Sequence, residues 1–259
     1  MVQLDPVIEL NTFSIAAREG ETGAFGVAVA TKARVNTELG RQGLLLVDQG
    51  VPIDVGLSAL LWKDGEREIR QVHGVDAERA FCHTGTGCVA WCGHEAGADF
   101  TVAGNMLTGS EVIAAMARAF RDGEGELSGR LLLALEAGQA AGGDKRGKQS
   151  AALLVASPEP RMHHNLRVDD NADPVAELRR VYEVVVEHSG RIEREYGPEA
   201  ARLTRWLTKR KPGGNRRVCR AVWTPCWKPD RSCCTVGGVS TLRCSRNLAA
   251  SRPAVVGIS

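Results

Sequence analysis

The chain has 259 residues, of which 43% are hydrophobic and 25% charged, so it is long enough to bury a sizeable core. Residues 1–10 have neither the basic nor the apolar region of a secretory signal, and no stretch approaches the about 20 apolar residues of a membrane-spanning helix. The sequence therefore predicts a cytoplasmic location and no membrane partner.

The net charge of +2 hides two halves of opposite sign. Residues 1–204 carry 21 Lys and Arg against 30 Asp and Glu, whereas residues 205–259 carry 12 against one. The tail from about residue 215 is rich in Cys, Trp, Arg and Ser and has no helical or strand period. This pattern favours disorder over a nucleic-acid surface, so no nucleic-acid partner is expected. The tail also resembles translation in a shifted reading frame.

The first part of the chain predicts a β-hairpin followed by two helices. A Gly-containing turn separates two short runs of strand pattern, and apolar residues at helical spacing follow on either side of Gly50 and Pro52. The hairpin strands are predicted at residues 12–17 and 25–31, and the helices at 38–47 and 53–62.

The pattern then returns to short strands, which we expect to form an antiparallel meander over residues 68–75, 79–83, 89–93 and 100–104. Helices are predicted over 110–121 and 127–141, the second ending at two glycines. Strands over 149–156 and 164–168 precede a helix that begins at Asp173-Pro174 and runs through residue 183 or beyond. Because strands cluster in runs and do not alternate with helices, the order favours an α+β class.

Several motifs carry a resemblance to a known family. The most distinctive is residues 136–153, EAGQAAGGDKRGKQSAAL. The others are residues 12–16, 26–36, Gly40, 43–44, 84–85, Cys88, Trp91, 93–94, 104–107, 166–170 and 173–178. With these, the chain resembles a widespread, uncharacterised bacterial family that is grouped by fold with the N-terminal-nucleophile (Ntn) hydrolases. The resemblance implies a four-layer α-β-β-α sandwich over residues 11–185. Residues 186–214 would be a helical extension or linker, and 215–259 the tail.

The sequence departs from the family pattern after Lys32. There the pattern would hold a further loop and strand rich in small residues, but Lys32 runs directly into Ala33-Arg-Val-Asn36. Part of the first sheet is therefore expected to be missing. Together with the tail, this gap raises the alternative that the chain is the inactive product of a damaged gene.

The resemblance implies that Thr12 is the nucleophile of an amide hydrolase. In Ntn hydrolases the residue at the mature N-terminus attacks an amide carbonyl, and its own α-amino group, with a pKa of about 8, is the base. Eleven residues precede Thr12 and would have to be removed. Lys32 would lie beside Thr12 and lower the pKa of the amine. The alternatives are that Thr12 is an ordinary strand residue and Lys32 a charged strand end.

Four polar residues are candidates for substrate binding. Asp144 and Arg146 belong to a turn ahead of a buried strand, and Gln149 begins that strand. There they could position a polar substrate. Asn105 follows a strand and could donate to an oxyanion. In the alternative interpretation, Asp144 and Asn105 only stabilise turns, and the glycines of residues 142–147 end a helix.

Cys82, Cys88, Cys92 and His94 invite comparison with a zinc site. Their spacing is not a known paired-Cys pattern, so we interpret the thiols as small core residues and expect no metal.

The sequence thus predicts an Ntn-type hydrolase acting on a small-molecule or peptide amide, without metal or organic cofactor. A homodimer is left open. The rival hypothesis is a non-catalytic ligand- or peptide-binding protein on the same fold, and the sequence names no substrate.

Overall fold

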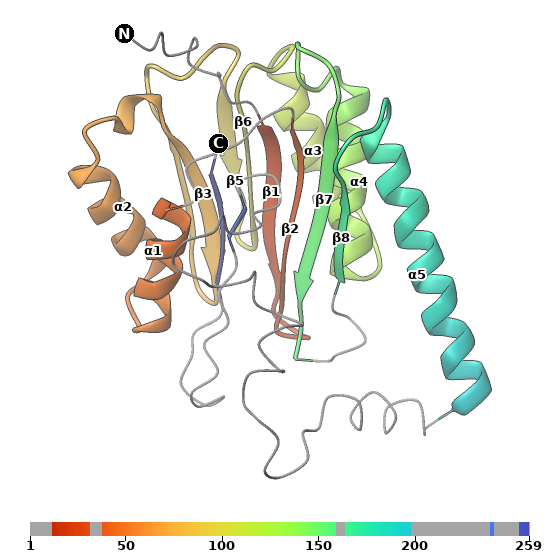
Figure 1. Cartoon of the computed structure of the whole chain (residues 1–259). Coiled ribbons are helices and arrows are strands. Elements are labelled where there is room, and N and C mark those ends of the chain that lie inside the picture. The colour runs from red at the N-terminus through yellow and green to blue at the C-terminus, as the bar shows by residue number, and fades with distance from the viewer. Residues whose placement is uncertain (1–11, 32–37, 159–163, 198–238, 241–253, 259) are drawn as a thin grey trace, which may run out of the picture.

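Two antiparallel sheets and five α-helices make up the described part of the chain, so the class is α+β as expected (Figure 1). The computed structural model describes residues 12–31, 38–158, 164–197, 239–240 and 254–258. The helices are α1 (Glu38–Asp48), α2 (Ile53–Lys63), α3 (Glu111–Asp122), α4 (Leu127–Ala140) and α5 (Pro174–Tyr196), with a short 3-10 turn at Arg67–Ile69.

The larger sheet is built around a central hairpin. Its strand order is β5 (Gly93–Ala96), β6 (Phe100–Gly104), β1 (Thr12–Glu19), β2 (Ala24–Thr31), β7 (Ser150–Ala156) and β8 (His164–Val168). The hairpin turn ends at Gly23, whose φ of 68° favours glycine and whose N–H donates to the carbonyl of Glu19 at 2.9 Å. All eight residues of β2 are buried, so both faces of this strand are covered.

One face of this sheet packs against α3 and α4. Phe13 and Ile15 of β1 and Leu153 of β7 point into a cluster with helix residues such as Met116 and Leu131. Residues at the alternate positions of the strand, such as Ala16, point to the opposite face, as the period of two along a strand requires. Helix α5 is joined to α4 by the Arg179–Glu136 ion pair, with distances of 2.6 and 2.9 Å.

The opposite face packs against a second sheet. Its strand order is β4 (Ala80–Thr84), β3 (Gln71–Asp76), β10 (Ala254–Ile258) and β9 (Val239–Ser240). Val27 and Val29 of the first sheet meet Val75 and Val255 of the second in an apolar cluster. The far side of the second sheet is covered by α1 and α2, through residues such as Leu44, Val47 and Leu57.

A buried polar contact links the two sheets. The hydroxyl of Ser14 in β1 lies 2.8 Å from Nε2 of His73 in β3, and Nδ1 of His73 lies 2.9 Å from Oγ1 of Thr101 in β6. Both ring nitrogens therefore have partners inside the core. Burial lowers the pKa of His73 to about 3, because the charged imidazolium would lose its hydration there.

Most element predictions are confirmed within one to three residues, including the front hairpin and the helix at Asp173-Pro174. The meander prediction is wrong, because β3 and β4 belong to one sheet and β5 and β6 to the other. The strand expected at 89–93 begins only at Gly93. The carbonyls of Val89 and Trp91 instead accept N–H groups of Met106 and Leu107, in the loop after β6.

The expected disorder of the tail from residue 215 is wrong for Ala254–Ile258. This segment forms β10, which pairs with β3 over five residues and buries Val255 and Val256. Tail composition did not reveal it because five residues are too short for a periodic signal amid basic neighbours. The remaining tail residues other than 239–240 lie outside the described residues.

His73 predicts a pH dependence of stability. Its pKa in the folded protein is about 3, below the unfolded value of 6.5, so between these values the unfolded state binds more protons. The contribution of His73 to the free energy of unfolding is therefore complete well above pH 6.5 and is lost as the pH falls. From about pH 7 to about pH 5 the loss from this group should be about 2 kcal/mol. Urea titrations of wild type and His73→Gln at both pH values measure it, since subtraction cancels the other histidines. An equal loss in both proteins would contradict the assignment.

Candidate functional site

Four strand ends meet where β1 begins. Thr12, the first residue of β1, pairs with Thr31, the last residue of β2, and Thr31 pairs with Ser150, the first residue of β7. On the other side of β1, Phe13 pairs with Gly104, the last residue of β6. The antiparallel register thus brings residues that are far apart in sequence to the same end of the strands of the larger sheet.

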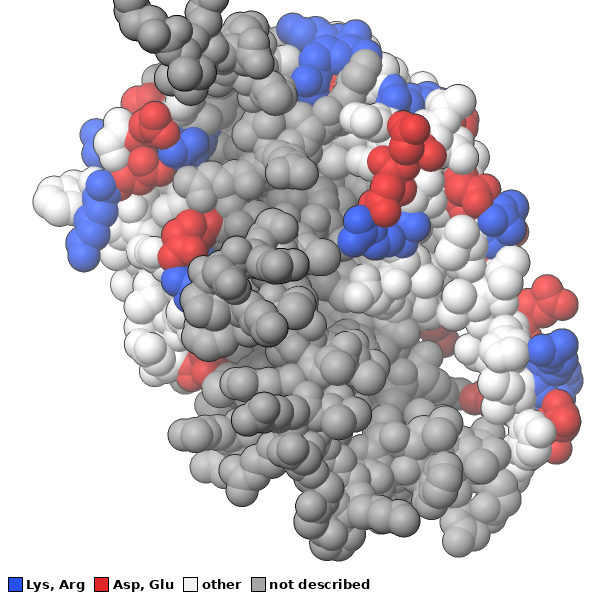
Figure 2. All heavy atoms as spheres, in the orientation of Figure 1, with Lys and Arg blue, Asp and Glu red and all other residues white. Residues whose placement is uncertain are grey.

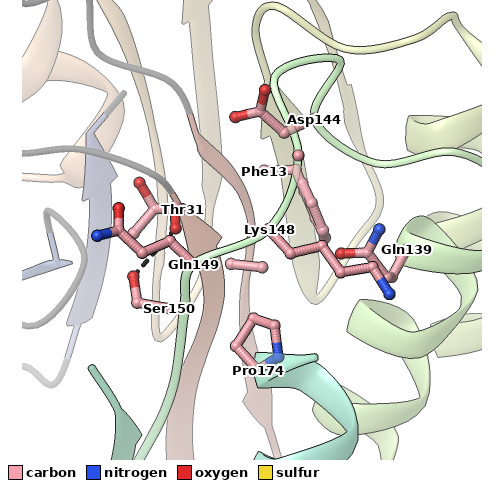
Figure 3. Close-up of a pocket in the computed structure, with 10 residues that line it drawn as sticks. Phe13, Thr31, Gln139, Asp144, Lys148, Gln149, Ser150 and Pro174 are labelled. Carbon is pink, nitrogen blue, oxygen red and sulfur yellow. Dashed lines mark hydrogen bonds between the residues drawn. The ribbon is translucent and has the colours of Figure 1, made fainter. Parts of the chain in front are cut away.

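A small pocket opens at this end of the strands (Figure 3). Figure 3 shows Thr31, Gln149 and Ser150 on one side of Phe13 and Gln139 on the other, with Lys148 extending toward Gln139. The Ser150 hydroxyl donates to the carbonyl of Thr31 at 3.0 Å. The lining comprises Phe13, Ala30, Thr31, Gln139, Asp144, Gly147, Lys148, Gln149, Ser150 and Pro174. Phe13, Ala30 and Pro174 make part of this lining apolar, and the other lining residues, called the rim below, are mostly polar.

The turn after α4 forms part of the rim. Gly142 and Gly143 have φ values of 117° and 57°, which confirms that the predicted C-terminal glycines adopt the left-handed region. A Cβ on Gly142 would lie 2.3 Å from Oγ1 of Thr108, so only glycine fits against this loop. The N–H of Thr108 donates to the Gly143 carbonyl at 3.1 Å. The turn is therefore fastened to the segment that follows β6.

Asp144 and Arg146 bind each other within this turn. Oδ1 of Asp144 accepts the backbone N–H of Arg146 at 2.8 Å, and Oδ2 lies 3.1 Å from Nη2 of the guanidinium. The Asp144 side chain is 4% exposed and that of Arg146 28%. The carboxylate lines the pocket while its charge is locally balanced, and Arg146 is not among the residues that line it.

The rim also carries Gln149 and Lys148. Gln149, a predicted binding residue, is exposed and lines the pocket. Lys148, which the sequence interpretation did not single out, lines it too and pairs with Asp173 at 3.0 Å. Asp173 precedes α5 as the sequence indicates, but its side chain binds Lys148 and does not cap the helix. This pair joins the turn to the start of α5.

Asn105 lies one residue beyond β6, near the site in register but inside the protein. It is 5% exposed, and its Nδ2 donates to Oε1 of Gln71 at 3.2 Å. Nε2 of Gln71 donates to the carbonyls of Gly93 and Gly104, each at 3.0 Å. Asn105 is absent from the pocket lining. Gln71 lies 34 positions away on the second sheet, so no local sequence signal could have revealed this contact.

The two predicted catalytic residues have different outcomes. The structure places the backbone of Thr12 at the end of the sheet's central strands where the pocket opens, and Thr12 pairs there with Thr31. Lys32 follows Thr31 directly and lies outside the described residues. The structure therefore gives the position of the Thr12 backbone within the sheet and leaves both side-chain roles as predictions.

The three cysteines of the described domain are half-buried free thiols. Burial raises the pKa of Cys82 to about 12, and burial is also the main cause of a raised pKa at Cys88. Raised values keep these thiols protonated, which is unfavourable for metal binding and for nucleophilic attack. Among the described residues, no group of three or more His, Cys, Asp or Glu side chains is arranged to hold a metal ion.

The surface charges are intermingled on the face that Figure 2 shows, where acidic and basic side chains lie next to one another. Ion pairs of the described surface include Arg180–Glu177 at 2.6 Å and Arg79–Asp54 at 2.9 Å. Such exposed pairs contribute little stability but balance charge locally. No helix among the described residues is long and apolar enough to cross a membrane.

The fold and site define a mixed α+β protein with a small pocket at the ends of the central strands of an antiparallel sheet. Residues 12–178 match a family of unknown function, DUF1028, and the chain belongs to this family. Among solved structures it is similar to protein SPO2555 from Silicibacter pomeroyi, described as DUF1028, with 30% sequence identity and a TM-score of 0.61. The similarity covers 67% of this chain and 85% of that one. No curated protein matches the chain.

We expect Asp144→Asn to destabilise the domain by about 1–2 kcal/mol, because a buried carboxylate loses charge-assisted bonds to the backbone and guanidinium of Arg146. Urea unfolding at neutral pH measures the change. Glu124→Gln, at an exposed helix connection, is the matched acid-to-amide control and should unfold like wild type. Equal unfolding of all three proteins would show that the Asp144–Arg146 contact does not stabilise the turn.

Proposed function

We propose that this protein is an Ntn-type amide hydrolase whose nucleophile is Thr12 after removal of residues 1–11. One observation carries the proposal: β1 begins at Thr12, at the end of the central strands where the pocket opens. The family match also begins at Thr12, which supports a domain boundary at this residue. The proposed fold is the four-layer Ntn sandwich, and the packing of helices on the outer face of each sheet supports it.

The proposed chemistry uses a single residue as nucleophile and base. The free α-amino group of Thr12, with a pKa near about 8, accepts the proton of the Thr12 hydroxyl as its oxygen bonds to the amide carbon. The amide C–N bond then breaks, and the leaving amine takes that proton. Water attacks the resulting ester and releases the acid, which restores the Thr12 hydroxyl. These steps are balanced without a redox change, so the proposal requires neither metal nor organic cofactor.

The neighbouring residues have supporting roles in this proposal. Lys32, next to the Thr31 partner of Thr12, would lower the pKa of the amine by its positive charge. Gln149 on the rim would bind the polar part of a small-molecule or peptide amide. Asp144, with Arg146, would fix the turn that shapes the pocket. Gln71 bonds both Asn105 and the carbonyl of Gly104, so Asn105 would help to fix the end of β6. A cytoplasmic location and a homodimer complete the proposal.

A ligand-binding protein without catalysis is the second candidate. The burial of Asn105 against Gln71 favours it, because the predicted oxyanion donor, which only a hydrolase needs, is engaged within the protein. The two functions differ in one requirement. Only the hydrolase needs a free amine at Thr12, so only the hydrolase must lose residues 1–11.

An aliphatic β-lactone, which acylates nucleophilic hydroxyls, tests the hydrolase directly. We expect one lactone to be added to the chain that starts at Thr12, and peptide mapping should place it on that residue. Thr12→Ala should not be labelled. Thr22→Ala is the control, because Thr22 lies in the turn at the other end of the same hairpin and binds Glu19 there. Intact mass and peptide mapping measure all three proteins.

Labelling of a chain that still carries Met1 would refute the mechanism, and so would labelling of Thr12→Ala at the wild-type rate. A chain that starts at Thr12, folds and remains unlabelled would favour the ligand-binding function.

A further inference from the structure

The strand β10 is a separate segment that completes the second sheet. It lies between β3 and β9, with Ala254 opposite Asp76 and Ile258 opposite Val72 (Figure 1). The sequence between Tyr196 and Ala254 comprises 57 residues, of which two form β9. The described contacts of β10 are with β3, with β9 and with the layers on either side of the second sheet.

Both faces of β10 are buried against different layers. Val255 is 1% exposed and packs in the cluster between the sheets, with Val27 and Val29. Val256 is fully buried and packs in the cluster under α1 and α2, with Leu44 and Leu57. Successive residues of a strand point to opposite faces, so two adjacent aliphatic side chains are required here.

The facing strand is adapted to a close neighbour. A Cβ on Gly74 of β3 would lie 2.3 Å from the carbonyl oxygen of Val255 and 3.0 Å from Cα of Val256. Any larger residue at position 74 would push β10 away from β3. Gly74 therefore accommodates the backbone of an added strand, which is one use of glycine inside a strand.

We propose that the edge of β3 opposite β4, covered by α1 and α2 on one face and by the larger sheet on the other, is a binding site for an extended peptide, and that Ala254–Ile258 is its occupant. The site binds by β-augmentation: β3 supplies main-chain hydrogen bonds along the edge opposite β4, and two apolar clusters select the side chains at positions 255 and 256. The same sequence supplied as a free peptide therefore replaces the segment at this edge. This inference is independent of the proposed hydrolase.

The test uses the full chain with Val255→Asp and Val256→Asp, which should release the strand because two carboxylates cannot be buried in apolar clusters. The probe is a fluorescent peptide of residues 251–259, SRPAVVGIS. We expect saturable binding to the variant by fluorescence anisotropy, with a rise in its Tm. A peptide carrying the same two aspartates should not bind. Adding Gly74→Val to the variant should weaken binding by about tenfold or more, because the strand can no longer approach β3.

The matched control is Val184→Asp with Val186→Asp, two exposed valines of α5. We expect the control to keep the wild-type Tm, whereas the β10 variant loses about 10 °C or more. A β10 variant that is folded by circular dichroism and does not bind the peptide overturns the proposal. So does a β10 variant with the wild-type Tm.

Hydrogen exchange in the wild-type chain gives an answer even if the β10 variant does not fold. Peptides covering 254–258 should exchange about 100-fold or more slowly than an unstructured peptide, together with those covering 71–76. Exchange of 254–258 at the rate of an unstructured peptide would overturn the proposal, because the site would then have no bound strand.

Discussion

The burial of β2 on both faces is the constraint on which the rest of the structure depends. Every side chain of Ala24–Thr31 is buried, so this strand and its partner β1 require apolar cover on two sides. Helices α3 and α4 provide one cover and the second sheet the other. The second sheet then has an outer face of its own, which α1 and α2 cover. A front hairpin of small and branched residues thus determines how many layers must follow.

The same hairpin determines where a functional site can form. At its open end the start of β1 lies beside the end of β2. The neighbouring strands β6 and β7 have one end at the same place. Thr108, after β6, and Gly143, before β7, meet there although they lie 35 positions apart in the chain. The turn after α4 is fastened to the loop after β6 by hydrogen bonds and by the fit of Gly142 against Thr108. A rigid sheet with fastened loops is a common way to position polar groups precisely enough for chemistry.

The sequence predicted local structure well and the pairing of distant elements poorly. Hairpin, helices and the strand after the glycine turn were all evident from period and capping residues. The split of the expected meander between two sheets was not, because period indicates a strand without its neighbours. At the site, Asp144 and Gln149 line the pocket and their binding roles stay predictions, whereas Asn105 faces Gln71 inside the core. That contact depends on packing between sheets, which leaves no trace in the residues beside Asn105.

The pairing of β10 with β3 has a consequence for how the protein is made. Gly74 and Val256 are partners in the sheet but lie 182 positions apart in the chain. Contacts over such separations slow folding, because a long loop must close before they form. During synthesis on the ribosome, β3 and α1 emerge long before β10, and their apolar surfaces remain uncovered until residues 254–258 have been made. The nascent chain is then most prone to aggregation, and a chaperone that binds exposed strand edges would meet this protein at that stage.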